Sequence, residues 1–379
     1  MKRIYLDNAA TSRVSQTALD AMTPYFTELW ANPSGKYSSS TEVKKLLELS
    51  HKTVADALGC GRDEIIFTSS GSESNCLAVK GAARANAEKG RHIISSAMEH
   101  TSVMLALKEL SAEGFDVTYI NPEADGVINA EKIKNAVRVD TALVCVMYAN
   151  NETGAIQPIR EISQTAHNHN ALFFTDAVQA AGALPLDVSA LGADMLSLSG
   201  HKINAPKGIG ALYVKKGIKI KPLINGTQEN GLRGGTENAA FAAAFAAALR
   251  EARENIADNK KVAALRDMLY EGIAARVPDI KLNGGAAPRL PGILNISFIG
   301  TQSEGVLHLL DTAGIEASAG SACTSGQDTP SHVLTSMNLT PAEAKSAIRF
   351  SLCRDNTEEE IKYVINTVSE IVQKLRAEI

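Results

Sequence analysis

The stretch MLSLSGHK, residues 195–202, decides the fold class of this chain. Its apolar part, Met195–Leu198, predicts a buried strand, and the chain then turns through Ser199 and Gly200 to reach Lys202. A lysine at the end of a buried strand is poorly placed for solvent, and desolvation favours the neutral amine that can form a Schiff base. An ordinary loop lysine would fit the same pattern, so the surrounding sequence has to decide between the two interpretations.

Short apolar runs alternate with longer helical patterns on both sides of this stretch, from about residue 64 to residue 235. The predicted strands are Ile65–Thr68, His92–Ser95, Val117–Ile120, Leu143–Tyr148, Leu172–Thr175, Met195–Leu198 and Gly210–Val214. Helical patterns fill most of the gaps, over Glu73–Ala87, Ser102–Ala112, Ala130–Val137 and Ile159–His169. This alternation predicts an α/β fold with a mainly parallel seven-stranded sheet that helices cover on both faces.

Two further polar stretches follow predicted strands. Asp176 follows the strand Leu172–Thr175, where a carboxylate could pair with a protonated ring nitrogen or could cap the next helix. The run SSGSES, residues 69–74, stands between a strand and a helix, where free amides can hold a phosphate, although Gly and Ser are also common turn and cap residues. A phosphate cradle, then a strand-end Asp, then a strand-end Lys is the order that a pyridoxal-phosphate site of the large α/β type requires.

The alternation stops near residue 235, and a smaller α/β domain is predicted beyond it. An alanine-rich segment, Asn238–Arg276, predicts a long helix that leads out of the first domain. The later elements are strand Ile293–Phe298, helix Ser303–Asp311, strand Ile315–Ala317, strand Ile348–Leu352 and a final helix that starts with a capping box at Thr357 and Glu360. We expect a large domain over residues 15–255 and a small domain made of residues 1–14 and 256–379.

Composition and charge are those of an ordinary globular protein. The 379 residues are 45% hydrophobic and 21% charged, with a formal net charge of −4, which predicts neither a nucleic-acid groove nor a membrane surface. The five cysteines include no CxxC pair, so neither a disulfide framework nor a metal site is predicted. The first residues, MKRIYLDNAAT, lack the apolar core of a signal peptide, and we expect a cytoplasmic protein.

Short motifs between Tyr5 and Leu352 occur in the order found in one enzyme family. They are Tyr5–Thr11, Phe67–Ser74, Glu99-His100, Asn150–Glu152, Asp176–Gln179, Ser199–Lys202, Arg233–Thr236, Gly320–Ser325 and Arg349–Leu352. Together they resemble the NifS/IscS-type cysteine desulfurases, within the class V, fold type I aminotransferase-like enzymes. The resemblance implies a pyridoxal 5'-phosphate cofactor and a reaction that removes sulfur from L-cysteine and releases L-alanine.

The resemblance also implies how the cofactor is held. Lys202 would carry it as a Schiff base, Asp176 would pair with its pyridine nitrogen, and Gln179 would hydrogen-bond its phenolic oxygen. The residues that would hold its phosphate are Gly71, Ser72, Ser199 and His201, joined by Thr236 from the partner subunit of a homodimer with shared active sites.

Three residues would act on the substrate side of the cofactor. By the same resemblance, His100 would stack on the ring and assist proton transfer. Asn151 would contact both cofactor and substrate. Arg349 would meet the substrate carboxylate, because a guanidinium can bind a carboxylate through two hydrogen bonds.

Cys323 lies in a segment of small and polar residues, Ala319–Gly326, where a buried structural cysteine is uncommon. A merely tolerated cysteine would fit this segment too, but the resemblance implies that Cys323 is the nucleophile that takes the sulfur as a persulfide. The loop at about 318–330 would then carry the sulfur to an acceptor. Cys60, Cys76 and Cys145 are expected to pack among apolar neighbours, and Cys353 could be a second thiol or a packing residue.

Three other interpretations share parts of this pattern. A selenocysteine lyase would share the fold and the cofactor, a class V aminotransferase would need no thiol, and a catalytically silent sulfur-transfer platform would need neither Lys202 nor Cys323. The sulfur acceptor stays open, because iron–sulfur scaffold assembly, tRNA thiolation and cofactor biosynthesis all draw on such enzymes. An iron–sulfur scaffold protein is the partner that we expect.

Overall fold

A computed structural model describes residues 3–320 and 329–378 of the chain, and its largest element is a seven-stranded sheet. The strands are β2 (Ile65–Thr68), β3 (His92–Ser96), β4 (Asp116–Ile120), β5 (Thr141–Cys145), β6 (Leu172–Asp176), β7 (Met195–Ser199) and β8 (Gly210–Val214). They lie in the order β2-β8-β7-β6-β5-β3-β4, and only β8 runs antiparallel to its neighbours. The mainly parallel seven-stranded sheet predicted from the sequence is confirmed.

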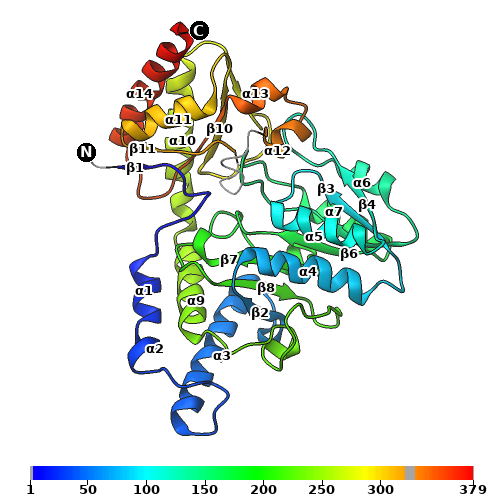
Figure 1. Ribbon diagram of the computed structural model, residues 1–379. Coiled ribbons are helices and arrows are strands. Elements are labelled where there is room, and N and C mark those ends of the chain that lie inside the picture. The colour runs from blue at the N-terminus through cyan, green and yellow to red at the C-terminus, as the bar shows by residue number, and fades with distance from the viewer. Residues whose placement is uncertain (1–2, 321–328, 379) are drawn as a thin grey trace.

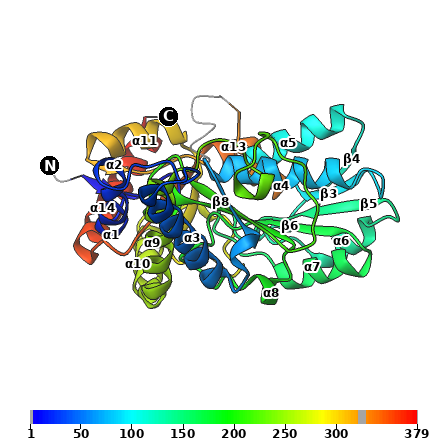
Figure 2. The same cartoon turned by 90° about the horizontal axis from the view of Figure 1, so that it is seen from below.

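Helices cover both faces of this sheet (Figures 1 and 2). One face carries α4 (Gly71–Ala85) and α5 (Thr101–Ala112), and the other carries α6 (Ala130–Ala136), α7 (Ile159–Asn168) and α8 (Val188–Leu191). Successive strand residues point to opposite faces, so Phe174 joins the buried cluster under α4 and α5, while Phe173 joins the cluster under α6 and α7. Burial on both faces explains why β2 and β5 are mostly apolar along their length.

Three N-terminal helices pack beside the sheet against α9 (Ala239–Glu254). They are α1 (Gln16–Met22), α2 (Pro24–Thr27) and α3 (Ser38–Leu58). The single long helix predicted over Asn238–Arg276 is wrong, because α9 ends at Glu254 and α10 (Asn259–Ala274) starts a new helix. A short 3-10 turn, η4 (Ile256–Asp258), separates them in a polar stretch whose Asn and Asp side chains compete for backbone hydrogen bonds.

A second, smaller α/β unit lies at the far end of α10 (Figure 1). Its strand β10 (Ile293–Phe298) pairs antiparallel with β9 (Ile280–Leu282) and β12 (Ala347–Ser351), and β1 (Ile4–Tyr5) pairs parallel with β11 (Ile315–Glu316). The helices of this unit are α10, α11 (Ser303–Thr312), α12 (His332–Ser336), α13 (Pro341–Lys345) and α14 (Glu358–Ala377). Leu6 from the N-terminus belongs to the buried cluster of this unit.

The strand predicted over Leu143–Tyr148 is shorter in the structure, because β5 ends at Cys145. The next residues still bond to β6, through Val146 N to Phe174 O and Tyr148 N to Asp176 O. On the other side, the backbone N–H of Met147 donates to the carboxylate of Glu99 instead of to a strand. After Cys145, a hydrogen bond to a side chain therefore replaces a strand hydrogen bond, at the edge of the sheet where the polar motifs lie.

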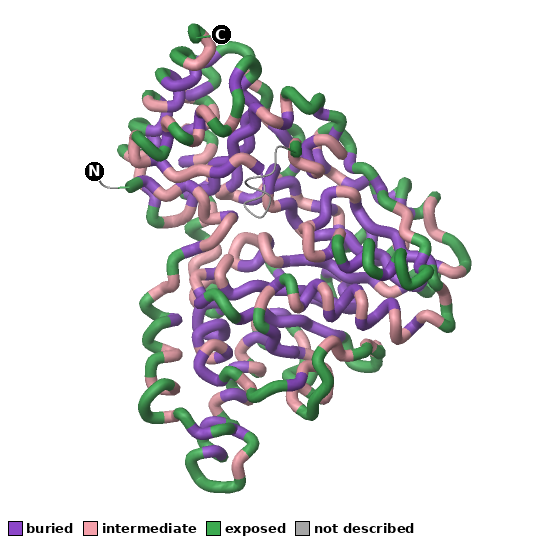
Figure 3. The backbone as a smooth tube through the Cα atoms, viewed as in Figure 1, coloured by how far each residue is buried: buried purple, intermediate pink, exposed green. Residues whose placement is uncertain are grey.

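The buried segments of the molecule are the strands of the large sheet and the inner faces of its helices, as Figure 3 shows. Short 3-10 turns join some of the elements, namely η1 (Arg62–Glu64), η2 (Gly200–Lys202) and η3 (Glu229–Gly231). Among the helices of the described residues, none combines the length and the apolar character that crossing a bilayer requires.

Candidate active site

The carboxyl ends of three strands of the large sheet meet at one edge. Asp176 ends β6 and Ser199 ends β7, and the two strands are paired so that Asp176 lies opposite Ser197. Lys202 follows β7 within the turn η2. The end of β2 leads into α4, whose first residue is Gly71. Because β2, β6 and β7 run parallel, these residues converge on the crevice where open α/β sheets bind ligands.

One cavity at this edge gathers most of the residues that the sequence singled out. They are Gly71, Ser72, His100, Asn151, Asp176, Gln179, Ser199, His201, Lys202 and Arg349. Thr236 is not among them, since it lies on an exposed loop and lines a separate hollow with Arg233. Cys323 lies outside the described residues. The structure thus brings the cofactor-side residues together from segments that are far apart in the sequence.

Asp176 is buried at the bottom of this cavity. Its Oδ1 accepts from the backbone N–H of Val178 at 2.9 Å, and its Oδ2 accepts from Nδ2 of Asn75 at 2.7 Å. Within the described residues Asp176 forms no salt bridge. A buried carboxylate that is held by neutral donors alone is suited to pair with a cationic ring nitrogen of a ligand.

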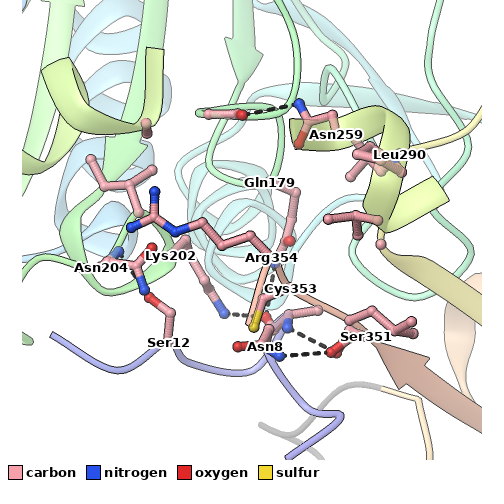
Figure 4. Close-up of a pocket in the computed structure, with 18 of the residues that line it drawn as sticks. Asn8, Ser12, Gln179, Lys202, Asn204, Asn259, Leu290, Ser351, Cys353 and Arg354 are labelled. Atoms are coloured by element: carbon pink, nitrogen blue, oxygen red, sulfur yellow. Dashed lines mark hydrogen bonds between the residues drawn. The ribbon is translucent and has the colours of Figure 1, made fainter. Parts of the chain in front are cut away.

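Lys202 lines the same cavity. Its Nζ donates to the backbone oxygens of Ala9 at 2.5 Å and Ala10 at 2.6 Å, and Nε2 of Gln179 donates to the same oxygen of Ala9 at 2.9 Å. Lys202 and Gln179 also line a second cavity, together with Asn8 and Cys353 (Figure 4). Residues 8–10, which follow β1 near the N-terminus, therefore form part of the site around Lys202.

The first residues of α4, Gly71 and Ser72, line one part of the cavity, and this part is suited to bind an anion. A side chain at Gly71 would place its Cβ 2.9 Å from Cγ2 of Val178 and 3.0 Å from Cβ of Ser199, so only a glycine lets the helix begin this close. The first amides of a helix point outward and attract phosphate. Burial, and the charges of Lys202 and Lys207, lower the pKa of His201 to about 4, so its ring is neutral near pH 7.

Arg349 on β12 is buried, with 1% of its surface exposed. Its Nη2 lies 2.7 Å from Oδ1 of Asp7, and its Nη1 donates to the backbone oxygen of Asn151 at 3.0 Å. Its Nε has no hydrogen-bond partner within the described residues. The guanidinium therefore keeps one buried donor available beside the cavity.

Four polar residues of this region have roles that the sequence did not predict. Asp7 holds Arg349, and Glu99 accepts from Met147 N, while Asn75 and Ser102 lie between Asp176 and His100. Asn75 falls one helical turn after Gly71, on the face of α4 that must point inward, and this spacing was the one signal that could have revealed it. The other three depend on contacts between distant segments.

Glu99 is fully buried behind the cavity. Burial raises the pKa of Glu99 to about 8, although hydrogen bonds from Ser96 Oγ at 2.5 Å and Met147 N at 2.8 Å act in the opposite direction. Its second oxygen, Oε2, has no hydrogen-bond partner within the described residues. We conclude that Glu99 is held largely as the neutral acid near pH 7.

The cysteines that the structure describes are free thiols, and their surroundings fit packing. Cys145 is buried in the cluster under α4 and α5, and Cys60 and Cys76 pack against the large-domain clusters. Burial raises the pKa of all of them, to about 12 for Cys60. Cys353 lines the second cavity, and burial raises its pKa as well, which disfavours the reactive thiolate.

These residues fit pyridoxal phosphate on observations of the structure itself. The glycine-requiring helix start suits its phosphate, Asp176, which has no cationic partner among the described residues, suits its ring nitrogen, and Lys202 lines the same cavity. A mainly parallel sheet with this constellation at its strand ends defines a pyridoxal-phosphate-dependent enzyme of fold type I.

Comparisons with known proteins narrow this class. The family described as aminotransferase class-V matches residues 4–364. A protein named cysteine desulfurase IscS from Clostridium botulinum is 45% identical over 99% of this chain and 96% of its own length, and one of the same name from Methanosarcina thermophila is 44% identical over 99% and 93%.

Solved structures agree with the sequence relatives. A NifS-like protein superimposes with a TM-score of 0.92 at 35% identity, covering 98% of this chain and all of its own. A structure titled SspA in complex with cysteine gives a TM-score of 0.82 at 36% identity, covering 92% and 98%. The chain belongs to the class V aminotransferase family and, within it, to the cysteine desulfurases.

Proposed function

We propose that this enzyme removes the sulfur of L-cysteine, releases L-alanine and keeps the sulfur as a persulfide on Cys323. The observation that carries the proposal is the cavity in which Lys202, Asp176 and Arg349 lie together. Lys202, Asp176 and Gln179 would hold the cofactor ring, and the start of α4 with Ser199 and His201 would hold its phosphate. The bound cofactor supplies an electron sink for the carbon atoms of the substrate.

The residues of the chain supply the other parts of the reaction. Arg349 binds the substrate carboxylate with Asn151 beside it, which fixes the orientation of the amino acid. His100 would donate or accept protons at the cavity wall, and the amine of Lys202 would take up the Cα proton. The thiolate of Cys323 attacks the substrate sulfur, so that an S–S bond forms, the Cβ–S bond breaks, and the electron pair stays with the substrate until protonation gives alanine.

The described residues on either side of Cys323 lie beside this cavity. Ser331 Oγ donates to Oε2 of Glu152 at 2.6 Å, and a Cβ at Gly320 would lie 3.1 Å from the same oxygen. Ser318 exchanges backbone hydrogen bonds with Arg349. One end of the segment that contains Cys323 therefore bonds to Arg349, and the other bonds to Glu152, the neighbour of Asn151, which supports the assignment of Cys323 as the nucleophile.

A homodimer with shared sites is part of this proposal. Thr236 is exposed and does not line the cavity of its own chain, which supports a role at the phosphate of a partner subunit. Exposed apolar side chains gather on the N-terminal segment, among them Phe26, Trp30 and Tyr37, and Trp30 is 74% exposed. Apolar surface of this kind is typical of an interface between subunits.

The acceptor and the compartment follow from the family resemblance. We propose a protein acceptor of the iron–sulfur scaffold type and a cytoplasmic location. The free cysteines of the described residues suit a reducing compartment.

The proposal is tested by following sulfide and alanine from L-cysteine in the presence of a reductant. Wild-type enzyme should form both in equal amounts, and Cys323→Ala should lower both rates roughly a hundredfold or more. Cys353→Ala is the matched control, because it removes a thiol that lines the neighbouring cavity, and it should keep the wild-type rates. Equal sulfide release from Cys323→Ala and wild type would refute the persulfide assignment.

A further inference from the structure

Two polar side chains connect His100 to Asp176. Asn75 is 1% exposed on α4, and its Nδ2 lies 2.7 Å from Oδ2 of Asp176 and 2.9 Å from Oγ of Ser102. Oγ of Ser102, on α5, lies 2.8 Å from Nδ1 of His100. These side chains form one continuous series of hydrogen bonds along the wall of the cavity.

The orientation of the Asn75 amide follows from its neighbours. Its Oδ1 accepts from Oγ of Ser197 at 2.5 Å. The flipped amide would place its carbonyl oxygen 2.7 Å from a carboxylate oxygen of Asp176, which is repulsive. Both hydrogens of the amide group are therefore donated, one to Asp176 and one to Ser102.

The orientation of the Ser102 hydroxyl follows in turn. Its oxygen accepts from Asn75, and because Nδ1 of His100 is an acceptor for a backbone N–H, the hydroxyl hydrogen is directed to Nδ1 as well. The backbone N–H of Ser102 also donates to Nδ1, at 3.2 Å. Since two donors converge on Nδ1, this nitrogen is an acceptor, and the proton of the neutral imidazole lies on Nε2.

We infer that Asn75 and Ser102 are positioning residues that fix His100 in the tautomer with its proton on Nε2. Nδ1 is engaged at the start of α5, so Nε2 is the ring nitrogen that remains for chemistry in the cavity. The first event at this nitrogen is therefore donation of a proton to a group in the cavity, and Nε2 can accept a proton only after that. The same amide holds Asp176, so one residue orients both the acid beneath the cofactor and the histidine.

The tautomer can be measured directly. Holoenzyme labelled with nitrogen-15 in its histidine rings reports protonated and unprotonated nitrogens at well-separated chemical shifts, and the His100 signals are those lost in His100→Gln. We expect a protonated Nε2 and an unprotonated Nδ1. A ring protonated on Nδ1 in the wild-type enzyme would overturn the inference.

Variants test the connection itself. Ser102→Ala leaves only the backbone N–H at Nδ1, so the His100 signals should shift towards a mixture of tautomers, and Ser102→Thr, which keeps a hydroxyl, should restore the wild-type pattern. Asn75→Asp should also give a mixture although Ser102 is intact, because the new carboxylate accepts the hydroxyl hydrogen. Unchanged His100 signals in both Ser102→Ala and Asn75→Asp would contradict the inference.

A matched control separates this effect from general destabilisation. Ser163→Ala removes a buried hydroxyl that donates to the backbone oxygen of Leu191 at 2.8 Å on the other face of the sheet. It should leave the His100 signals unchanged, whereas kcat for alanine formation in Ser102→Ala should fall roughly fivefold to tenfold, the equivalent of one hydrogen bond. The inference rests on the proposed role of His100 in catalysis. Because the nitrogen-15 signals report the tautomer in the absence of substrate, a wrong tautomer and a wrong catalytic role give different results.

Discussion

At the scale of single residues, the cavity is built around charged groups whose partners come from distant parts of the chain. Arg349 is paired with Asp7, and Asp176 is held by Asn75 and by the backbone of Val178. Buried charges are costly unless they are paired and hydrogen-bonded. The unpartnered Nε of Arg349 and the missing cationic partner of Asp176 within the described residues are best explained by charges that a cofactor and a substrate bring.

Arg349→Lys tests this explanation. Lysine keeps the charge but cannot form two parallel hydrogen bonds to a carboxylate, so KM for L-cysteine should rise roughly tenfold or more while cofactor binding is retained. Steady-state kinetics with the absorbance of the bound cofactor measure both. Arg354→Lys, in an arginine paired with Glu251 outside the cavity of Asp176, is the matched control and should leave KM unchanged. An unaltered KM in Arg349→Lys would exclude it as the carboxylate-binding residue.

Glu99 makes stability depend on pH. Burial raises its folded-state pKa from the ordinary 4.5 to about 8, so the contribution of its neutral form is complete below pH 4.5 and is lost as the pH rises to about 8. Relative to Glu99→Gln, which is always neutral, the wild type should lose on the order of 2 kcal/mol of unfolding free energy between pH 6 and pH 9. Urea unfolding at fixed protein and cofactor concentrations measures this difference.

The control for this experiment is Glu109→Gln on the exposed surface. A hydrogen bond from Lys80, with another from Arg84, lowers the pKa of Glu109, so this residue stays ionised across the same range. Its difference from the wild type should not change between pH 6 and pH 9. A parallel change in both variants would show that Glu99 is not the titrating group.

At the scale of elements, the start of α4 is the part of the fold that depends most on one residue. Gly71→Ala would bring a methyl group within 3.0 Å of Val178 and Ser199 and would move the helix amides away from the phosphate. We expect the dissociation constant of pyridoxal phosphate to rise roughly tenfold, equivalent to about 1.4 kcal/mol, as followed by cofactor titration of the apoprotein. Gly305→Ala in α11 is the control, since its Cβ would lie 3.8 Å from Leu375 in ordinary contact. Equal cofactor affinity in both variants would remove Gly71 from the phosphate site.

The sequence predicted those elements whose apolar pattern is local. Seven strands and the helices between them were found because each is short, apolar and bounded by polar turns. The end of α9 at Glu254 was not predicted because helical periodicity continues across it. The strand β5 was predicted too long because the Glu99 carboxylate, which accepts a hydrogen bond from Met147 N, lies far away in the sequence. Asn75, Ser102 and Asp7 were missed for the same reason, since their roles exist only once distant segments meet.

At the scale of the whole molecule, the cavity lies where both units contribute, and one predicted residue is left outside it. The large sheet supplies Asp176 and Lys202, and the small unit supplies Arg349 through β12. Thr236 lines a different hollow on the same chain. The homodimer that we propose would place Thr236 of a second copy of the chain at the phosphate site of the first.

Mixed dimers test this arrangement. Lys202→Ala inactivates its own cavity, whereas Thr236→Ala damages the cavity of the partner subunit. In a heterodimer of the two, one cavity keeps an intact Lys202 and receives Thr236 from the Lys202→Ala chain, so activity should recover to roughly half of the wild-type value per dimer, as expected for one working site in two. The measurement is alanine formation after the two variants are co-expressed with different tags and the doubly tagged dimer is isolated. If Thr236 served its own chain, neither cavity of that dimer would be complete, and its activity would stay at the level of the single variants.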